Sequence, residues 1–329
     1  MKKHKFRELC IFLQKSIKIF AALLITGILF SCATNPRISL SPEIDGDEFS
    51  LLPAGGLAYI WGDVREAGSL IELLLFEGGS RESADILNRT RYAAAALFPQ
   101  AAGTEGRNYY LAAFGSYPRR SANISMMFSR DWRRQRSSTG STYWYSRSSE
   151  MTLAMSSNFA LVSDLDPFIA PSTASLSMPA VSVPDGFLDF RRGKALAGWI
   201  NEAQEPLNSF LESFGLPIQI PAEELFFGAL RLPSIDSSEI QWELSFKIKT
   251  SSDREARALI SLFNIAMLFI QRTGQGTPPP SGTLQPMDFF SLLFGNPLEQ
   301  DEEFIIIRSA PMNDVRVALL LGLFPIYSS

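Results

Sequence analysis

Residues that commonly carry catalysis or bind metals are scarce in this sequence of 329 residues. It contains one histidine, His4, and two cysteines, Cys10 and Cys32. The chain beyond Cys32 therefore has no Ser-His-Asp triad, no Cys-His pair and no zinc site built from histidine or cysteine. It cannot form an internal disulfide either, so its stability has to come from the packing of its core.

Lysines and phosphate-binding glycine motifs are also rare. Lys194, Lys247 and Lys249 are the only lysines after Cys32, and the sequence has no G-x-x-x-x-G-K-[ST] or G-x-G-x-x-G motif. Asp63 and Glu66 are spaced for acid–base work, but Asp-x-x-Glu before an apolar helical pattern is more simply a helix cap. We therefore expect no enzyme, no cofactor and no metal site.

The first 32 residues have the pattern of an export signal. Six basic residues precede position 19, the run 19–30 is apolar apart from Thr26, and the run ends Leu29-Phe30-Ser31-Cys32. This run of about a dozen residues is shorter than the roughly 20 that a membrane-spanning helix needs. The order basic, apolar, small residue, cysteine predicts a signal whose cysteine is kept and lipidated.

This segment resembles the signal peptides of bacterial lipoproteins. Phe30 departs from the commoner Ala, Ser, Thr or Val, and relaxed motifs of this kind are typical of spirochaete lipoproteins. The resemblance implies a signal peptide over 1–31, a diacylglyceryl group on the Cys32 sulfur and an extracytoplasmic protein held on a bacterial membrane. It does not indicate which membrane or which face. The alternatives are a plain signal peptide with a chance cysteine, or a membrane anchor that starts near Cys10.

The charge balance excludes one class of partner. Removal of residues 1–31 takes away six basic residues and one acid, which leaves 24 basic and 33 acidic residues and a net charge of −9. A general nucleic-acid-binding protein needs a net basic face. We therefore expect no nucleic acid among the partners.

Composition also predicts the domain organisation. Residues 32–50 are polar and read as a lipidated tether, and 171–184, rich in Ser, Pro and Ala, read as a linker. The remaining ranges, 51–170 and 185–329, are each long enough to bury a core. Pro53-x-Gly55 and Pro184-x-Gly186 open these units 131 residues apart, which favours a duplication. A single α+β domain with chance spacing is the alternative.

The expected elements follow one order in both units. Strands are expected at 57–61 and 187–190, and apolar residues at helical spacing predict a helix near 67–74 and another over 196–214. Two strands follow (91–98 and 108–117; 224–232 and 239–249), then a helix (121–132; 253–271) and a closing hairpin (143–164; 303–324). Strand, helix, strand, strand, helix, strand, strand predicts two tandem ferredoxin-like units, that is, a split β-α-β pattern with an extra edge strand.

The first unit contains a local cationic patch with aromatic residues. It comprises Arg130, Trp132, Arg133, Arg134, Arg136 and Trp144, with Asp131 as the only acid from 119 to 147. Bidentate arginine contacts suit phosphate or carboxylate groups, such as lipid head groups or cell-wall polymers. The alternative is a solvated loop whose arginines pair with acids elsewhere in the fold.

The second unit contains an apolar segment beside a Gly/Pro/Thr-rich loop. Phe289, Phe290 and Phe294 lie in it, after the loop at 274–286. Such a segment is either a contact surface for a partner or a membrane, or a short helix that covers the core.

Three functions are compatible with these patterns. The leading hypothesis is a non-enzymatic envelope lipoprotein that binds or scaffolds an envelope protein, a lipid or a cell-wall polymer. A carrier of an apolar ligand, held in a cavity between sheet and helices, is the alternative. An enzyme that uses carboxylates alone is the least favoured of the three, because no pair of acids is free of a capping role.

Overall fold

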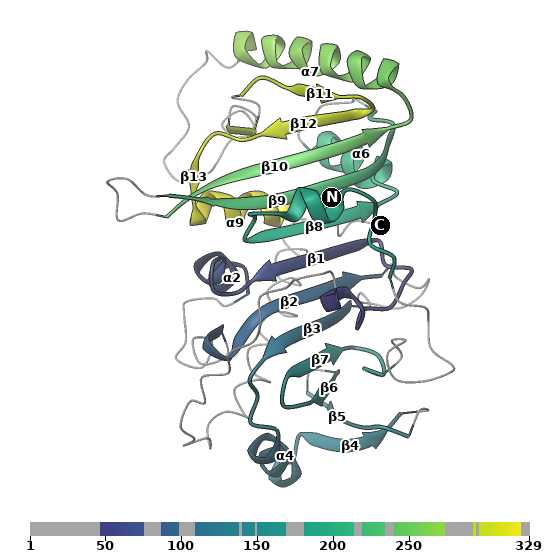
Figure 1. The fold of residues 1–329 in the computed structure, drawn as a ribbon, viewed down its shortest axis with the longest axis vertical. Coiled ribbons are helices and arrows are strands. Elements are labelled where there is room, and N and C mark those ends of the chain that lie inside the picture. Colours follow the sequence, from purple (N-terminus) through teal and green to yellow (C-terminus); the bar gives the residue numbers. More distant parts are fainter. Residues whose placement is uncertain are drawn as a thin grey trace. The chain divides into compact units, whose positions relative to one another are not determined.

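The chain folds into two units, Met1–Asp185 and Gly186–Ser329, in a computed structural model (Figure 1). The structure describes residues 47–75, 87–98, 109–137, 140–148, 150–168, 181–213, 219–233, 240–273, 292–293 and 296–323. In each unit an antiparallel sheet is accompanied by helices. No helix within these ranges is long and apolar enough to span a membrane.

Unit 1 contains an antiparallel sheet, with seven strands among its described residues. Its elements are η1 (Asp47–Phe49), β1 (Ala58–Asp63), α2 (Gly68–Leu75), β2 (Thr90–Leu97), β3 (Tyr109–Gly115), α4 (Arg119–Phe128), β4 (Trp132–Arg136), β5 (Thr142–Ser146), β6 (Met151–Met155) and β7 (Phe159–Ser163). The strands pair antiparallel in the order β1-β2-β3-β7-β6-β5-β4. β4 therefore ends this order, with β5 as its only strand neighbour among the described residues.

Unit 2 has a smaller antiparallel sheet. Its elements are α5 (Phe187–Arg191), β8 (Leu196–Asn201), α6 (Gln204–Ser213), β9 (Ala222–Leu232), β10 (Gln241–Thr250), α7 (Asp253–Thr273), β11 (Glu299–Asp301), β12 (Phe304–Arg308), β13 (Met312–Asn313) and α9 (Asp314–Leu323). The order within this unit is β8-β9-β10-β12-β11, and β13 also pairs with β10.

The ferredoxin-like prediction is wrong. A split β-α-β unit keeps another strand between the two strands that flank its first helix. Here β1 pairs directly with β2, although α2 separates them in the sequence, and β8 pairs directly with β9, although α6 separates them. Each unit instead runs its first three strands as consecutive antiparallel neighbours.

The start of unit 2 also differs from the prediction. Gly186, at a φ of 76°, begins helix α5, so 187–190 is not a strand. The range 196–214 divides into β8 and α6 because residues 196–200 are all buried, as in a strand covered on both faces. Pro206 lies in the first turn of α6, where its missing N–H costs no helical hydrogen bond.

The two openings are consequently not equivalent. In unit 1 the hydroxyl of Tyr59 donates to Pro53 O (2.9 Å) and accepts from Gly56 N–H (2.8 Å), which folds the Pro-Gly segment against β1. In unit 2 the matching Pro-Gly segment leads into α5, whose Phe187 packs on Trp199 and Phe226. The spacing of the openings therefore does not support a duplication.

The later elements differ from the prediction at their ends. α4 stops at Phe128 and Trp132 opens β4, so the predicted helix 121–132 is too long. The expected hairpin 143–164 is three strands, β5 to β7, and the second arm of the expected hairpin 303–324 is mostly α9. The expected strands at 91–98, 108–117, 224–232 and 239–249 correspond to β2, β3, β9 and β10.

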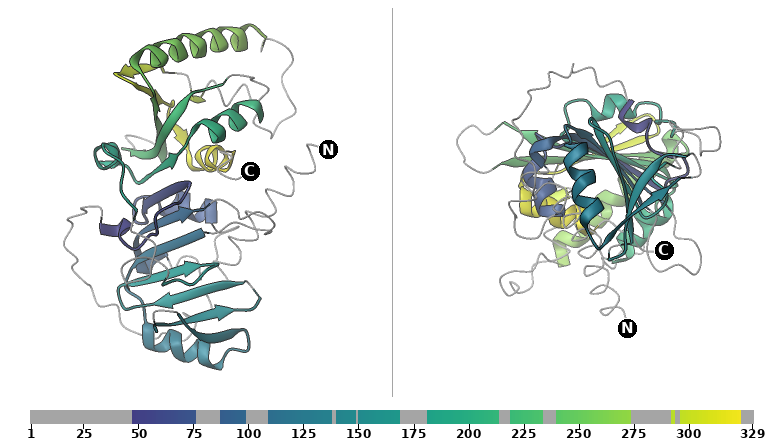
Figure 2. Two further views of the ribbon diagram at one scale, coloured as in Figure 1. Left: turned by 90° about the vertical axis from the view of Figure 1, so that its right-hand side faces the viewer. Right: turned by 90° about the horizontal axis from the view of Figure 1, so that it is seen from below.

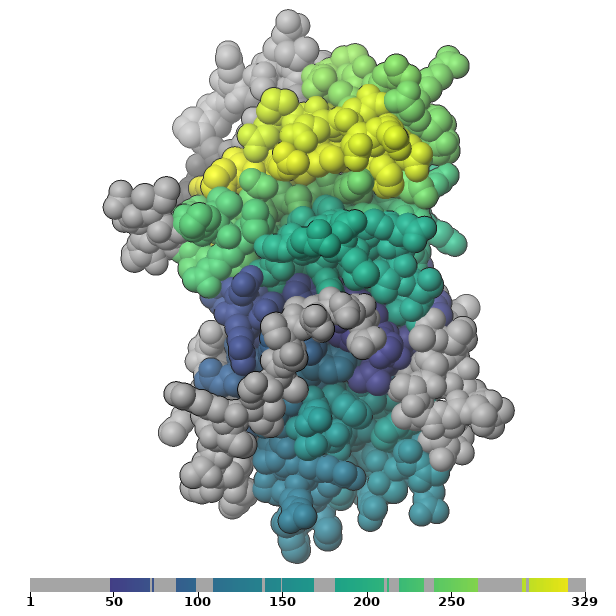
Figure 3. Space-filling view, viewed as in Figure 1, coloured from purple at the N-terminus to yellow at the C-terminus, as the bar shows by residue number. Residues whose placement is uncertain are grey.

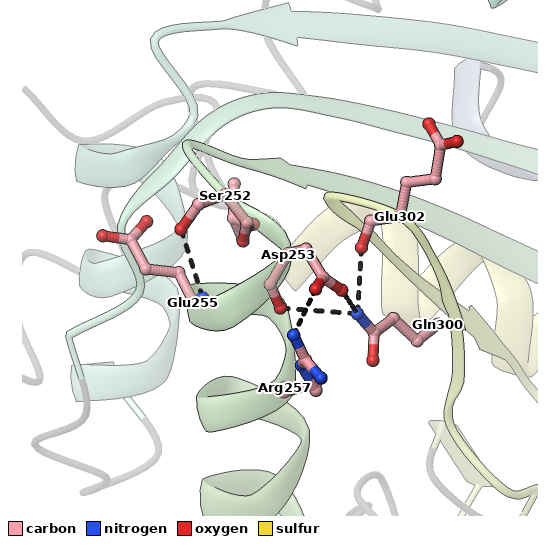
Figure 4. A network of polar contacts seen from close by, with 7 residues as sticks. Ser252, Asp253, Glu255, Arg257, Gln300 and Glu302 are labelled. Atoms are coloured by element: carbon pink, nitrogen blue, oxygen red, sulfur yellow. Dashed lines mark hydrogen bonds and ion pairs between the residues drawn. The ribbon is translucent and has the colours of Figure 1, made fainter.

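The N-terminus of α7 is held by hydrogen bonds from the residues before it and from strand β11 (Figure 4). Ser252 Oγ accepts a hydrogen bond from Glu255 N–H (3.3 Å), as the side chain of an N-cap residue does. Glu255, however, accepts from Ser251 Oγ (2.6 Å). The carboxylate of Asp253 binds Arg257 one turn further on and Gln300 of β11, which fixes this helix end to the sheet.

Candidate functional site

Part of the predicted site set lies outside the described residues. Cys32 and the apolar segment with Phe289, Phe290 and Phe294 belong to this part. Lipidation at Cys32 and contact through the three phenylalanines stay predictions. The arginine–aromatic patch, in contrast, falls on β4, β5 and the turn before β4.

The patch is a β-hairpin at the end of the unit 1 sheet. Trp132 pairs with Ser146, Arg134 with Trp144 and Arg136 with Thr142, without a register shift. The side chains of Arg130, Arg133, Arg134 and Arg136 are exposed. The segment is therefore ordered backbone with arginines on its surface, which differs from the solvated loop considered above.

The two tryptophans of the patch belong to the core. Trp132 is 5% exposed and Trp144 is 9% exposed, and both pack with Ala122 and Met126 of α4. Trp144 Nε1 donates to Asn123 Oδ1 (2.9 Å), so its one polar atom is satisfied within the fold. The structure thus separates the predicted patch into exposed arginines and buried tryptophans that hold α4 on the sheet.

The arginines at this end have no acidic partner among the described residues. None of Arg119, Arg120, Arg130, Arg133, Arg134, Arg136 and Arg147 forms an ion pair there. Asp131 lies among them, but its carboxylate accepts from Ser146 Oγ (2.6 Å) and Ser148 N–H (2.9 Å) instead. The cationic side chains are available to an external anion.

The lysines of unit 2 behave differently. Lys194 lies over the Phe190 ring (4.0 Å), Lys247 is 3.4 Å from Asp301, and Lys249 is 3.8 Å from Glu224. Burial lowers the pKa of Lys194, as does the charge of Arg308. All three lysines beyond Cys32 are therefore used in internal contacts.

Helix α4 carries a second apolar surface that faces outward. Ile124, Met127 and Phe128 are 54%, 64% and 82% exposed, and together with Arg120 they follow the spacing of one helix face. Ala122 and Met126 lie on the opposite face and are buried. We call the set Arg120, Ile124, Met127 and Phe128 the α4 face; Arg119 lies beside it as the first residue of the helix. Figure 2 shows α4 beside the strands at the β4 end of unit 1, and Figure 3 shows this blue region at the surface.

The local sequence of α4 does not favour an isolated helix. Its first turn holds Arg119 and Arg120 and no acid, and Pro118 at the N-cap gives no side-chain hydrogen bond. Cations near a helix N-terminus oppose the helix dipole by about 0.3–1 kcal/mol each. Packing against Trp132 and Trp144 must offset this cost, because the two arginines do not stabilise the helix.

A group of titratable side chains lies at the other end of β3 and β7. Burial raises the pKa of Asp164 to about 6, although its Oδ1 accepts from Tyr109 N–H (3.2 Å). Burial also raises the pKa of Tyr110, whose hydroxyl donates to Pro167 O. Asp166 accepts from Ser137 Oγ (2.6 Å). These contacts fasten the segment after β7 to its neighbours. Within the described ranges no three His, Cys, Asp or Glu residues could hold a metal ion.

The α4 face is not among the features predicted from the sequence. A signal was nevertheless present. Ile124, Met127 and Phe128 repeat at three and four residues, offset from Ala122 and Met126, and one buried face cannot accommodate both sets. The neighbouring arginines at 130, 133, 134 and 136 were identified from the sequence, but the sequence alone did not predict that their side chains are exposed.

Comparisons with known proteins show that solved structures have a similar fold. Crystal form III of TP0453 superposes with a TM-score of 0.52 at 13% identity, over 89% of this chain and 99% of that chain. Crystal forms I and IV of TP0453 give TM-scores of 0.51 and 0.50, each at 15% identity. No protein-family model and no curated protein sequence matches. The similarity to TP0453 therefore extends over both units and concerns the fold alone.

Proposed function

We propose that this chain is a non-enzymatic, lipid-anchored envelope protein whose α4 face contacts an anionic membrane surface. One observation carries the proposal: three large apolar side chains are exposed side by side on α4, next to arginines that have no acidic partner in the described part of the chain. A helix of this kind, apolar on one face with basic residues at its border, is suited to lie in the plane of a membrane interface.

Arginine suits the proposed contact because its planar guanidinium binds phosphate oxygens in pairs. Each basic residue near an anionic membrane contributes about 1 kcal/mol to the binding free energy, and this contribution decreases with distance over about one Debye length. The arginines of α4 and β4 lie on one end of unit 1 and act together. The rest of the chain has a negative net charge, so an anionic membrane does not attract it.

The apolar part adds a contribution that salt does not screen. Full burial of a phenylalanine or methionine side chain is worth about 1.5–3 kcal/mol. Phe128, at 82% exposed, has the most to gain by entering the interface. The diacylglyceryl group expected on Cys32 carries two acyl chains, which are enough for a stable anchor, and the α4 face adds a second contact with the same membrane.

Vesicle flotation tests the membrane contact without the lipid anchor. Protein that starts at position 32 and carries Cys32→Ala should float with phosphatidylcholine vesicles that contain phosphatidylglycerol, and less with pure phosphatidylcholine. Arg119→Ser with Arg120→Ser should weaken binding by about 2 kcal/mol, roughly thirtyfold, at low salt. Phe128→Ser should weaken it by about 2 kcal/mol at any salt concentration.

Matched controls lie in unit 2. Leu188 is 41% exposed on α5, and Arg254 and Arg316 are exposed on α7 and α9. Leu188→Ser, and Arg254→Ser with Arg316→Ser, should leave flotation unchanged. Equal losses in both sets, or flotation that does not depend on phosphatidylglycerol, would contradict the proposal.

The lipid anchor is tested separately. Cells fed a clickable fatty acid should label the wild-type protein, and Cys32→Ala should lose the label and leave the membrane fraction. Labelled Cys32→Ala protein would contradict lipidation at this residue. Mass spectrometry of solvent-extracted protein tests the alternative function, because a carrier would release an apolar ligand in stoichiometric amount.

A further inference from the structure

The outer edge of β4 presents backbone groups that pair with no other described strand. At the two ends of the β4–β5 ladder, Ser137 N–H donates to Ser141 O (2.8 Å) and Arg147 N–H donates to Asp131 O (3.3 Å). Hydrogen-bonded pairs alternate along an antiparallel ladder, so Arg133 and Gln135 also point their backbone groups toward β5. The N–H and C=O of Trp132, Arg134 and Arg136 consequently point away from β5, and among the described strands none pairs with them.

This edge has none of the usual backbone features that prevent pairing. β4 contains neither proline nor glycine, and its register with β5 runs through five residue pairs without a bulge. Natural edges are commonly protected by bulges, prolines or charged side chains. Only the last of these is present, as Arg133, Arg134 and Arg136, all of them exposed.

The arginines decide which strand the edge can accept. A second copy of β4 would place arginines opposite arginines, which is destabilising in a strand pair. An acidic strand would place opposite charges across the new pair, since Arg134 and Arg136 lie on one face and Arg133 on the other. The same side chains thus exclude self-pairing and favour an acidic partner.

We propose that the β4 edge binds an extended acidic segment of a partner protein as an added strand. The backbone of Trp132, Arg134 and Arg136 supplies the hydrogen bonds, and the arginines supply selectivity for the acidic sequence. This site goes beyond the membrane contact because it uses the outward backbone groups of β4, whereas the α4 face consists of helix side chains; the β4 arginines contribute charge to both contacts. The two together make unit 1 a scaffold that holds a partner strand beside the membrane.

A pair of substitutions at Arg134 separates charge from backbone hydrogen bonding. Arg134→Ala and Arg134→Pro remove the same charge, but only proline removes the outward N–H. Both variants should fold, since this N–H is not in the β4–β5 ladder and proline is tolerated at such edge positions. The probe is a fluorescent peptide of three Glu-Val repeats, with a Lys-Val peptide as its control, in an anisotropy titration.

The wild-type protein should bind the Glu-Val peptide and not the Lys-Val peptide. Arg134→Ala should weaken binding up to about fivefold, as an exposed charge pair does, and Arg134→Pro should weaken it at least about tenfold more through the lost backbone bond. Equal affinities of the two variants, or equal binding of the two peptides, would overturn the proposal. Vesicle flotation should not distinguish the two variants, so a failure of one proposal leaves the other testable.

Amide hydrogen exchange gives a second measurement that needs no variant. In the free protein the amides of Trp132, Arg134 and Arg136 should exchange fast, and those of Arg133 and Gln135 slowly. The Glu-Val peptide should slow the first set and leave the second unchanged. No slowing, or slowing that appears without peptide as the protein concentration rises, would overturn the proposal, in the latter case in favour of a second copy.

Discussion

Two aspartates of unit 1 show how local surroundings set the sign of a carboxylate's contribution to stability. Burial raises the pKa of Asp164 to about 6. Partial burial also raises the pKa of Asp131, but hydrogen bonds from Ser146, Ser148 and the Arg147 backbone together lower it below its ordinary value. At neutral pH, ionised Asp164 therefore weakens the fold and ionised Asp131 stabilises it.

Asp164→Asn should stabilise unit 1 at neutral pH. The folded protein binds the Asp164 proton more tightly than the unfolded chain does, so the favourable contribution is complete below about pH 4 and is lost as the pH rises through about 6. Asparagine keeps the oxygen that accepts from Tyr109 N–H. After allowance for partial solvent exposure, the expected gain is about 1–2 kcal/mol at pH 7 and near zero at about pH 4. Urea unfolding at several pH values measures it.

Asp131→Asn is the matched control of opposite sign. Its folded pKa lies below the unfolded value, so its contribution is present above the unfolded pKa and is lost on acidification. This variant should lower the urea midpoint at pH 7 and have little effect at about pH 3. A gain from Asp131→Asn, or a pH-independent gain from Asp164→Asn, would show that the assigned surroundings are wrong.

Residue types were readable from the sequence and their exposure was not. The arginines at 130, 133, 134 and 136 were identified as a group, and Trp132 and Trp144 were grouped with them although they are buried under α4. Alternation along β4 would have separated Trp132 from Arg133, but it requires knowing that this segment is a strand. Tertiary packing of α4 on the hairpin supplies that information.

At the scale of elements, short apolar runs account for most of the errors. Leu196, Trp199 and Ile200 fit a helical spacing, yet they form a strand because every position from 196 to 200 is buried. Phe187–Arg191 is apolar enough for a strand, and Gly186 in the left-handed region starts a helix there instead. Periodicity alone does not separate a buried strand from a buried helix when the run is this short. The alternating strand at 241–250 was recognised because one of its faces is less buried.

Gly115 at the end of β3 is a second element-scale test. A Cβ at this position would lie 1.9 Å from Arg89 O, a backbone atom that also accepts from Ser116 N–H (2.9 Å). Gly115→Ala should therefore force β2 and β3 apart and cost about 2–3 kcal/mol. At Gly68, the first residue of α2, a Cβ meets nothing within 4 Å, so Gly68→Ala should stabilise by about 0.5 kcal/mol. Urea midpoints of the two variants check this, and equal effects would contradict the close approach.

At the scale of the molecule, the amino-acid composition was a better guide to the possible kinds of site than the order of predicted elements was to the strand topology. The lack of histidine and cysteine beyond Cys32 is independent of fold. Strand neighbours depend on long-range pairing, and the order of elements along the chain is compatible with both a split β-α-β unit and consecutive antiparallel neighbours. The similarity to TP0453 extends over both units, so this topology is not peculiar to one sequence.

The most direct test of the membrane contact is a probe on α4 itself. In Cys32→Ala protein that starts at position 32, no cysteine remains, so Phe128→Cys can be labelled alone with an environment-sensitive fluorophore, and Val315→Cys, 54% exposed on α9, serves as the control. Vesicles with phosphatidylglycerol should shift the emission of the probe at 128 to the blue, more at low salt, and leave the probe at 315 unchanged. An unchanged spectrum at 128, or the same shift at both positions, would contradict contact through the α4 face.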